Sequence, residues 1–171
     1  MNLVHHRFSR GNMKIRIICV GKIKEKFYRD AVEEYVKRLG RYAKVEIDEV
    51  ADEKTPEEAG EKVREQILHK EGERILGKIR DADYVSALAI EGREFSSPDF
   101  AGHISGLMGS GKSTLDFVIG GSLGLSGEVL SRADEKISFS RMTFPHQLMR
   151  VILLEQTYRA FRIINHEPYH K

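Results

Sequence analysis

The sequence predicts an α/β fold in which a mostly parallel sheet is covered by helices on both faces. Short runs rich in Ile and Val alternate along the chain with longer segments that have a helical apolar period. The run at residues 84–90 is almost continuously apolar, which is typical of a strand buried on both sides. A chain of 171 residues, 40% hydrophobic and 32% charged, is sufficient for one globular domain with its own core.

The alternation begins with a strand, a helix and a second strand. Residues 14–21 are rich in Ile and Val and predict the first strand. Residues 25–39 place apolar side chains at four-residue steps, and Gly40 ends the predicted helix. Lys44–Val50 alternates apolar residues with acids, as a half-exposed strand does.

A capping signal opens the next predicted helix. Thr55 provides a hydroxyl for the N-cap, Pro56 suits the first helical position, and Glu58 suits the third. This helix is expected to run to about Ile79, and the apolar strand at residues 84–90 follows it.

The second half repeats the alternation with shorter strands and ends in a long helix. The expected elements are, in order, a helix capped at Ser97 and reaching about Met108, a strand at 116–119, a short helix capped by Ser126, a strand at 136–139 and a helix at 145–164.

Residues 1–12 differ from the rest of the chain. They are polar, lack the apolar stretch of a signal peptide and stop just before Met13. We expect a disordered N-terminal extension or tag there, and a single domain at 13–171. No segment approaches the ~18 apolar residues of a membrane span, so no membrane partner is expected. The lone Cys19 lies in an apolar run, which predicts a buried thiol and a reducing compartment, the cytoplasm.

Two strand ends in the last third predict a ligand pocket. The strand at 116–119 enters a turn of small residues at 120–124, and the strand at 137–139 enters a loop at 140–146. Open α/β sheets bind ligands at such ends, because backbone N–H and C=O groups face the crevice there. Residues 136–171 also carry six Lys or Arg against two Glu, which suits a phosphate-bearing partner; a solvated helix face is an equal alternative.

A second motif matches the P-loop pattern G-x-x-x-x-G-K-[ST], from Gly106 to Ser113. In a P-loop, backbone N–H groups bind the phosphates, and here Lys112 and Ser113 would reach the outer phosphate oxygens and Mg²⁺. That loop requires a preceding strand and a following helix, so that the helix N-terminus faces the anion. The predicted order is the reverse, which favours a Gly-rich connection over a nucleotide site.

The C-terminal helix is too apolar for a single buried stripe. Six of the seven residues from Leu148 to Leu154 are apolar, whereas one core-facing stripe needs about half of them. Glu155 and Arg159 form a favourable pair at i,i+4. The composition favours a homodimer with the pocket near its interface, and a central helix in a monomer stays the alternative.

Four stretches in this third occur in the order found in one bacterial family. They are residues 119–125 (IGGSLGL), 138–146 (SFSRMTFPH), 154–160 (LEQTYRA) and 168–171 (PYHK). Together they resemble the ribosomal RNA large subunit methyltransferase H group of the SPOUT superfamily. The first strand and the strand end at 88–92 agree as well, so that the resemblance covers residues 13–171.

The resemblance implies a fold, an activity and a cofactor site. The family has a C-terminal trefoil knot, works as a homodimer and methylates N3 of a pseudouridine in helix 69 of 23S rRNA on assembled ribosomes. Its methyl donor is S-adenosylmethionine, and no metal is implied. By position, the cofactor contacts fall at Leu88, Gly120, Phe139, Ser140, Arg141, Met142, Thr143 and Phe144.

The resemblance also implies that the C-terminal tail contributes to catalysis. The N3 proton of the base must be removed, and a cationic group or a His near the base would assist. The candidates are His170, Tyr169 and Arg159, with the tail reaching the partner chain's site. His146 is assigned to the helix start or to packing. Two alternatives stay open: a P-loop NTPase or phosphotransferase, and a non-catalytic RNA-binding module.

Overall fold

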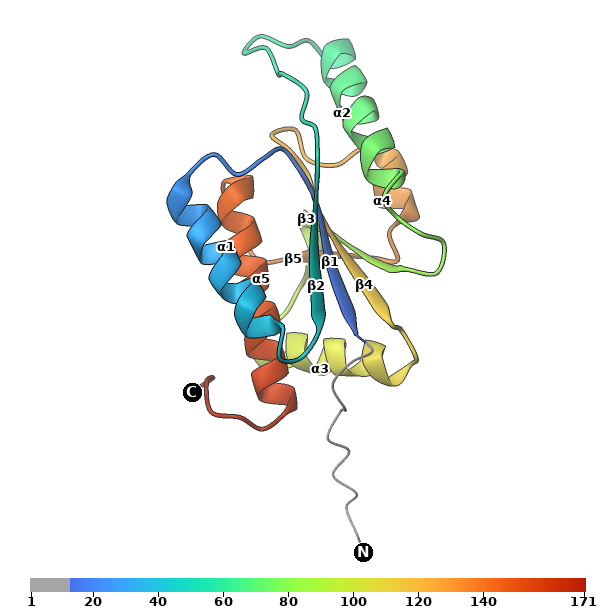
Figure 1. Ribbon diagram of the computed structural model, residues 1–171. Helices are drawn as coiled ribbons and strands as arrows, with labels where there is room; N and C mark the ends of the chain where they lie inside the picture. Colours follow the sequence, from blue (N-terminus) through green and yellow to red (C-terminus); the bar gives the residue numbers. More distant parts are fainter. Residues whose placement is uncertain (1–12) are drawn as a thin grey trace, which may run out of the picture.

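A computed structural model describes residues 13–171, so the extension or tag expected at 1–12 lies outside the described residues. Strands and helices alternate along the chain, as Figure 1 shows. The elements are β1 (Lys14–Val20), α1 (Lys26–Leu39), β2 (Lys44–Val50), α2 (Glu61–Leu76), β3 (Tyr84–Glu94), α3 (Ser97–Gly109), β4 (Thr114–Ile119), α4 (Gly127–Arg132), β5 (Glu135–Ser138) and α5 (His146–Ile164). Within residues 13–171, no helix is long and apolar enough to cross a membrane.

The five strands form one sheet in the order β2-β1-β4-β3-β5. Every neighbouring pair is parallel, with Lys14 opposite both Lys44 and Thr114 in the register of β1. The parallel sheet that the sequence predicts is therefore confirmed. Because parallel strands share one carboxyl edge, the loops after β3, β4 and β5 emerge on the same side of the molecule.

Helices cover both faces of the sheet (Figure 1), as predicted. Helices α1, α3 and α5 pack on one face, where Leu39, Ile104 and Leu153 are fully buried. Helices α2 and α4 cover the other face, where Ile75 and Val129 pack against the opposite sides of the strands. The central strands β1 and β4 are thus buried on both sides, which explains their largely apolar sequence, whereas the edge strand β2 is half-exposed.

Two helix starts differ from the prediction. Helix α2 begins at Glu61, and the predicted capping box lies in the preceding connection. There the Thr55 hydroxyl hydrogen-bonds the Ser122 hydroxyl at 3.2 Å, so a long-range contact replaces the local cap. In α3 the capping side chain is Ser96 rather than Ser97. The prediction erred by one residue because either serine satisfies the sequence pattern.

Strand β3 is longer than predicted and carries a bulge. It continues to Glu94, and both Leu88 and Arg93 pair with Ile137 of β5, so the residues between them leave the ladder. At Gly92 an added Cβ would lie 2.6 Å from the Ile137 carbonyl carbon, which only glycine tolerates. The bulge pushes residues 89–92 outward at the carboxyl edge of the sheet.

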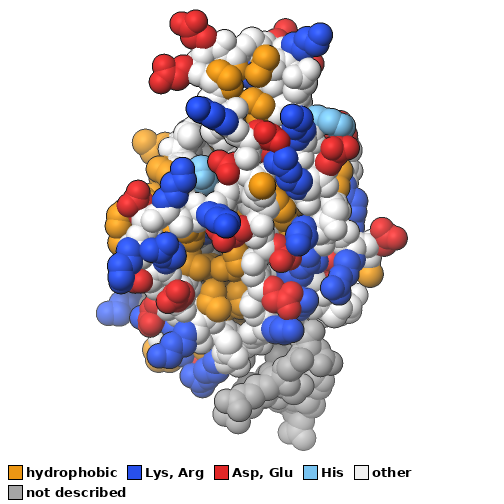
Figure 2. Space-filling view, turned by 45° about the horizontal axis from the view of Figure 1, so that its top comes forward, with side chains coloured by type: hydrophobic (Ala, Val, Ile, Leu, Met, Phe, Trp, Pro, Cys, Tyr) orange, Lys and Arg blue, Asp and Glu red, His pale blue; other side chains and the backbone are white. Residues whose placement is uncertain are grey.

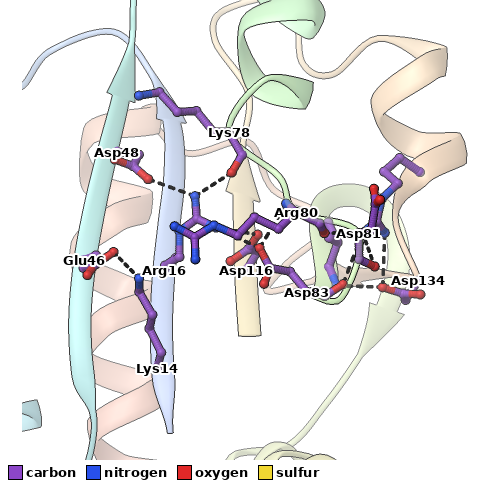
Figure 3. A network of polar contacts seen from close by, with 12 residues as sticks. Lys14, Arg16, Glu46, Asp48, Lys78, Arg80, Asp81, Asp83, Asp116 and Asp134 are labelled. Carbon is purple, nitrogen blue, oxygen red and sulfur yellow. Dashed lines mark hydrogen bonds and ion pairs between the residues drawn. The ribbon is translucent and has the colours of Figure 1, made fainter. Parts of the chain in front are cut away.

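A buried ionic network lies under α2, as Figure 3 shows. Arg16 of β1 is 4% exposed and its guanidinium contacts Asp83 at 2.8 Å and Asp116 at 3.3 Å. It also contacts Asp48 at 3.1 Å and donates to the Lys78 carbonyl at 2.6 Å. One side chain therefore connects β1, β2 and β4 with the segment between α2 and β3.

Candidate functional site

The carboxyl edge of the sheet holds a cavity of about 360 Å³, which is within the range of small-molecule sites. Its walls come from three segments that are distant in sequence: residues 88–90 after the regular part of β3, 119–124 after β4, and 137–144 after β5. The first turn of α5 closes one side with His146 and Met149. The two strand ends that predicted a pocket thus share a single cavity, and the β3 bulge adds a third wall.

The structure brings together all but one of the side chains predicted for the cofactor. Those that line the cavity are Leu88, Gly120, Phe139, Ser140, Met142, Thr143 and Phe144. The side chain of Arg141 is exposed and lies outside the lining. The Ser140 hydroxyl accepts the Met142 N–H at 2.9 Å, and this tight turn directs Arg141 away from the cavity. Their contact with a cofactor stays a prediction.

Gly120 and Gly121 form a tight backbone turn in the cavity wall. The chain turns back after β4, and the Gly124 N–H donates to the Gly121 carbonyl at 3.1 Å. A Cβ at Gly120 would lie 2.4 Å from the Gly124 carbonyl oxygen, so this position admits only glycine. The turn therefore exposes bare backbone to the cavity, as expected of a surface that binds a ligand through N–H and C=O groups.

The first turn of α5 contributes residues that the sequence analysis did not assign to the site. Burial and the charge of Arg150 lower the pKa of His146, so its imidazole is neutral at pH 7. Arg150 is fully buried and donates to the carbonyls of Val20 at 3.1 Å and Gly21 at 2.7 Å. These bonds fix the start of α5 against the end of β1. The only local signal was that His146 is the last residue of the loop at 140–146, which the sequence assigned to the pocket.

The three predicted catalytic residues lie together, but away from the cavity. Arg159 contacts Glu155 at 2.6 Å, which confirms the predicted pair, and its guanidinium lies 3.3 Å from His170 Nδ1. The Tyr169 ring packs under the Arg159 guanidinium at 4.7 Å, and its hydroxyl donates to Glu155 at 3.0 Å. Arg159 is 13 residues beyond His146, or ~20 Å along the helix axis. Within one chain, therefore, the tail does not line the cavity.

The tail cluster is held in charged and protonated forms. Burial, with the Glu155 carboxylate, raises the pKa of Tyr169 to about 12, so its phenol keeps its proton at neutral pH. The Glu155 partner raises the pKa of Arg159. Tyr169 can donate hydrogen bonds and Arg159 can stabilise an anion, but neither can remove a proton in this arrangement.

Three of the six basic residues at 136–171 are engaged in ion pairs within the protein. Arg150 pairs with Glu49 at 2.8 Å, and Arg159 pairs with Glu155. Arg162 pairs with Glu167. Lys136, Arg141 and Lys171 are exposed, so part of the positive charge stays at the surface. On the face drawn in Figure 2, Lys and Arg side chains are interspersed with Asp and Glu.

The P-loop-like stretch has the reversed order that the sequence predicted. Gly106 lies in the last turns of α3, and β4 begins at Thr114, directly after Ser113. Lys112 is exposed and its ammonium lies 5.9 Å from the Tyr84 ring. No helix N-terminus follows to face a phosphate, so the stretch is a connection.

Two further kinds of site, a reactive thiol and a metal centre, find no support in residues 13–171. Burial raises the pKa of Cys19 to about 12, so that the thiol is not ionised at neutral pH. Within these described residues, no three His, Cys, Asp or Glu side chains come together as ligands for a metal ion.

Known proteins match the chain over almost its whole length. A family model described as "Predicted SPOUT methyltransferase" matches residues 13–170. Proteins named ribosomal RNA large subunit methyltransferase H from Bifidobacterium animalis subsp. lactis, Clostridium beijerinckii and Enterococcus faecalis are 61%, 58% and 57% identical over 159 residues. In each case the match covers 93% of this chain and 100% of the relative.

The fold also has a counterpart among solved structures. A probable methylase family protein from Haemophilus influenzae Rd KW20 superposes with a TM-score of 0.51 over 94% of this chain and 70% of that chain. At 14% sequence identity this likeness concerns the fold alone. The family model and the identity to the curated relatives show that the chain belongs to the SPOUT methyltransferase family, in its ribosomal RNA large subunit methyltransferase H group.

Proposed function

We propose that the protein is an S-adenosylmethionine-dependent methyltransferase that methylates N3 of a pseudouridine in helix 69 of 23S rRNA on assembled ribosomes. The observation that carries this proposal is the cavity at the ends of β3, β4 and β5, lined by seven of the eight predicted cofactor residues. The names of the relatives supply the substrate class, large-subunit ribosomal RNA. A ribosomal substrate supports a cytoplasmic location, which we propose as well.

The cavity has the properties that S-adenosylmethionine requires. Leu88, Ile137 and Phe139 offer apolar surface for an adenine ring, and the turn at Gly120 offers backbone groups for its polar edges. When bound, the cofactor supplies a methyl group already activated by a sulfonium charge. The protein then has to hold the base nitrogen and the methyl carbon in line at ~3–3.5 Å and exclude water.

The pseudouridine base must be deprotonated before transfer, because its N3 nitrogen is part of an imide and carries a proton. Transfer requires that the N3 proton pass to a base, for which His170 is the predicted candidate. The nitrogen lone pair could then take the methyl group that the cofactor would supply, with the neutral thioether as the leaving group. A cation beside the base stabilises the anion that precedes transfer. Arg159 remains charged at all relevant pH values and suits this role, while Tyr169 can donate a hydrogen bond to a base carbonyl.

These roles require a second copy of the chain, since the tail lies far from the cavity of its own subunit. We propose a homodimer in which the Arg159, Tyr169 and His170 of one subunit complete the cavity of the other. Helix α5 supports this arrangement, because Leu148, Val151 and other apolar residues outside its buried face are only partly covered. Two antiparallel copies of α5 would bring each tail to the partner's cavity.

Mixing two inactive variants tests the composite site. Gly120→Ala impairs the cavity and His170→Ala impairs the tail, so each homodimer should be inactive in methyl transfer. A mixed dimer would hold one intact site, and statistical mixing should restore about a quarter of wild-type activity. No recovery after subunit exchange, shown complete by sedimentation or mass analysis, would contradict completion by the partner.

The family also implies a trefoil knot in the C-terminal third. The sheet order is compatible, because β5 lies beside β3 at one edge and the chain then returns past β4 to begin α5. Knots are rare exceptions to chain topology. We propose the knot for this chain, and a crystallographic trace of residues 84–171 tests it.

Thermal shift separates the proposal from the nucleotide-binding alternative. S-adenosylhomocysteine, the demethylated product, should raise the melting temperature in a concentration-dependent way, whereas Mg-ATP should not. Stabilisation by Mg-ATP alone, lost in Lys112→Ala, would instead support a P-loop enzyme. Methyl transfer to ribosomes separates an enzyme from a non-catalytic RNA-binding module.

A further inference from the structure

A second cavity, of about 270 Å³, adjoins the cofactor cavity. The two share Gly121, Ser122 and His146, so they are separated only by the glycine turn after β4 and the first turn of α5. The remaining walls come from the β2–α2 connection and from Glu71 of α2. We call this space the acidic chamber, after its Asp52, Glu53 and Glu71 side chains.

Glu71 is the unusual member of the acidic chamber. It is only 4% exposed, and its Oε1 accepts the Glu53 N–H at 2.9 Å, but Oε2 has no hydrogen-bond partner. Burial raises the pKa of this carboxyl, and Asp52 adds to the effect. A buried, unpartnered carboxylate oxygen is costly, and native structures retain such groups where they have a function.

The carboxylate lies directly against the cofactor turn. A Cβ at Gly121 would be 3.2 Å from Glu71 Oε2 and 3.5 Å from Oε1, so the glycine leaves just enough room for the carboxylate. Glu71 is therefore positioned to act on whatever occupies the space beside Gly121. It belongs to α2, on the face of the sheet opposite to α5.

The surrounding charges favour a cation over an anion. The chamber is lined by three carboxyl groups, those of Asp52, Glu53 and Glu71. Glu53 pairs with Arg74 at 2.6 Å, and Arg74 also donates to the Ala51 carbonyl at 2.8 Å. Lys54 is the one Lys or Arg among the residues that line the chamber, and burial and the charge of Arg150 lower the pKa of His146. An ammonium group has three donors and no acceptor, which matches this set of acceptors.

We infer that the acidic chamber binds the ammonium group of the amino-acid end of S-adenosylmethionine, with Glu71 as the residue that positions it. This inference rests on the proposed function. An adenine on the apolar side, against Leu88 and Phe139, leaves the other end of the cofactor directed toward Gly121 and His146. Holding that end would orient the sulfonium, and hence the methyl group, toward the base.

Calorimetric titration of the full-length protein with two analogues tests the inference. S-adenosylhomocysteine carries the ammonium and no sulfonium charge, whereas 5′-methylthioadenosine lacks the amino-acid end. Glu71→Gln should weaken S-adenosylhomocysteine about tenfold or more, as expected for a hydrogen bond to a charged group, and leave 5′-methylthioadenosine unchanged. The matched control is Glu73→Gln, an exposed glutamate two residues along α2, which should change neither affinity.

Other outcomes overturn the inference in distinguishable ways. Equal weakening of both analogues would show that Glu71 only supports the glycine turn. Weakening of S-adenosylmethionine without weakening of S-adenosylhomocysteine would assign the carboxylate to the sulfonium instead. Asp52→Asn, at an exposed position that does not endanger folding, should give the same selective loss with smaller size. A wild-type protein that binds none of these ligands would contradict the proposed function itself.

Discussion

Replacing Gly120 by alanine should strongly weaken cofactor binding. The added Cβ would lie 2.4 Å from the Gly124 carbonyl oxygen, 2.5 Å from its carbon and 3.0 Å from its Cα. All three are backbone atoms, so no side-chain rotation relieves the clash, and the turn must open by roughly 1 Å to reach ordinary contact distances. Overpacking of this kind costs about 1–3 kcal/mol.

The cost of about 1–3 kcal/mol for this substitution should lower both the stability of the fold and the affinity for the cofactor. Because the overpacking cost destabilises the closed turn that binding needs, S-adenosylhomocysteine should bind about 10- to 100-fold more weakly by calorimetry. The melting temperature should fall by only a few degrees. Gly127→Ala is the matched control, because a Cβ there meets no atom within 4 Å. A Gly120→Ala protein with wild-type affinity would refute the assignment of this turn to the cofactor.

Three further predictions concern other parts of the molecule. Burial raises the pKa of Asp116 to about 7, so the folded state keeps a proton that the unfolded state loses above pH ~4. The contribution of this group to the free energy of unfolding therefore falls as pH rises from ~4 to ~7. Urea unfolding of Asp116→Asn should lack this part of the pH dependence, and an unchanged pH slope would contradict it. Arg150→Met leaves the Val20 and Gly21 carbonyls without their donor and should cost about 3–5 kcal/mol in urea unfolding, so a loss under ~1 kcal/mol would be evidence against its anchoring role. Lys112→Ala should leave methyl transfer intact, and inactivation would reopen the P-loop interpretation.

The sequence predicted the fold well where local and long-range signals agree. The strands β1 and β4 are marked by Ile and Val because both of their faces are buried, whereas β2 alternates apolar residues with acids because it is half-exposed. The order of α3 and β4 was sufficient to reject the P-loop match, since that motif depends on what precedes and follows it. The capping box at Thr55 failed because its hydroxyl contacts Ser122, 67 residues away, and no local pattern encodes that contact.

The candidate site was predictable in part. Gly120 and Phe139 follow strands and therefore lie at the carboxyl edge, and the structure places both in one cavity. Glu71 gave no signal, because it lies in the middle of a charged helix and reaches Gly121 only through the packing of α2 on the sheet. The ~20 Å between Arg159 and His146 follows from the rise of the predicted helix at 145–164, whereas the packing of Tyr169 and His170 back onto Arg159 required the structure.

The central claim is methyl transfer to helix 69, and mass spectrometry of that segment tests it most directly. Ribosomes lacking the modification are incubated with the protein and S-adenosylmethionine, and the helix 69 fragment is then excised and sequenced by tandem mass analysis. We expect one added methyl group on N3 of a pseudouridine, and much less of it with Gly120→Ala at limiting S-adenosylmethionine. An unmodified fragment, under conditions where the protein binds S-adenosylhomocysteine, would contradict it.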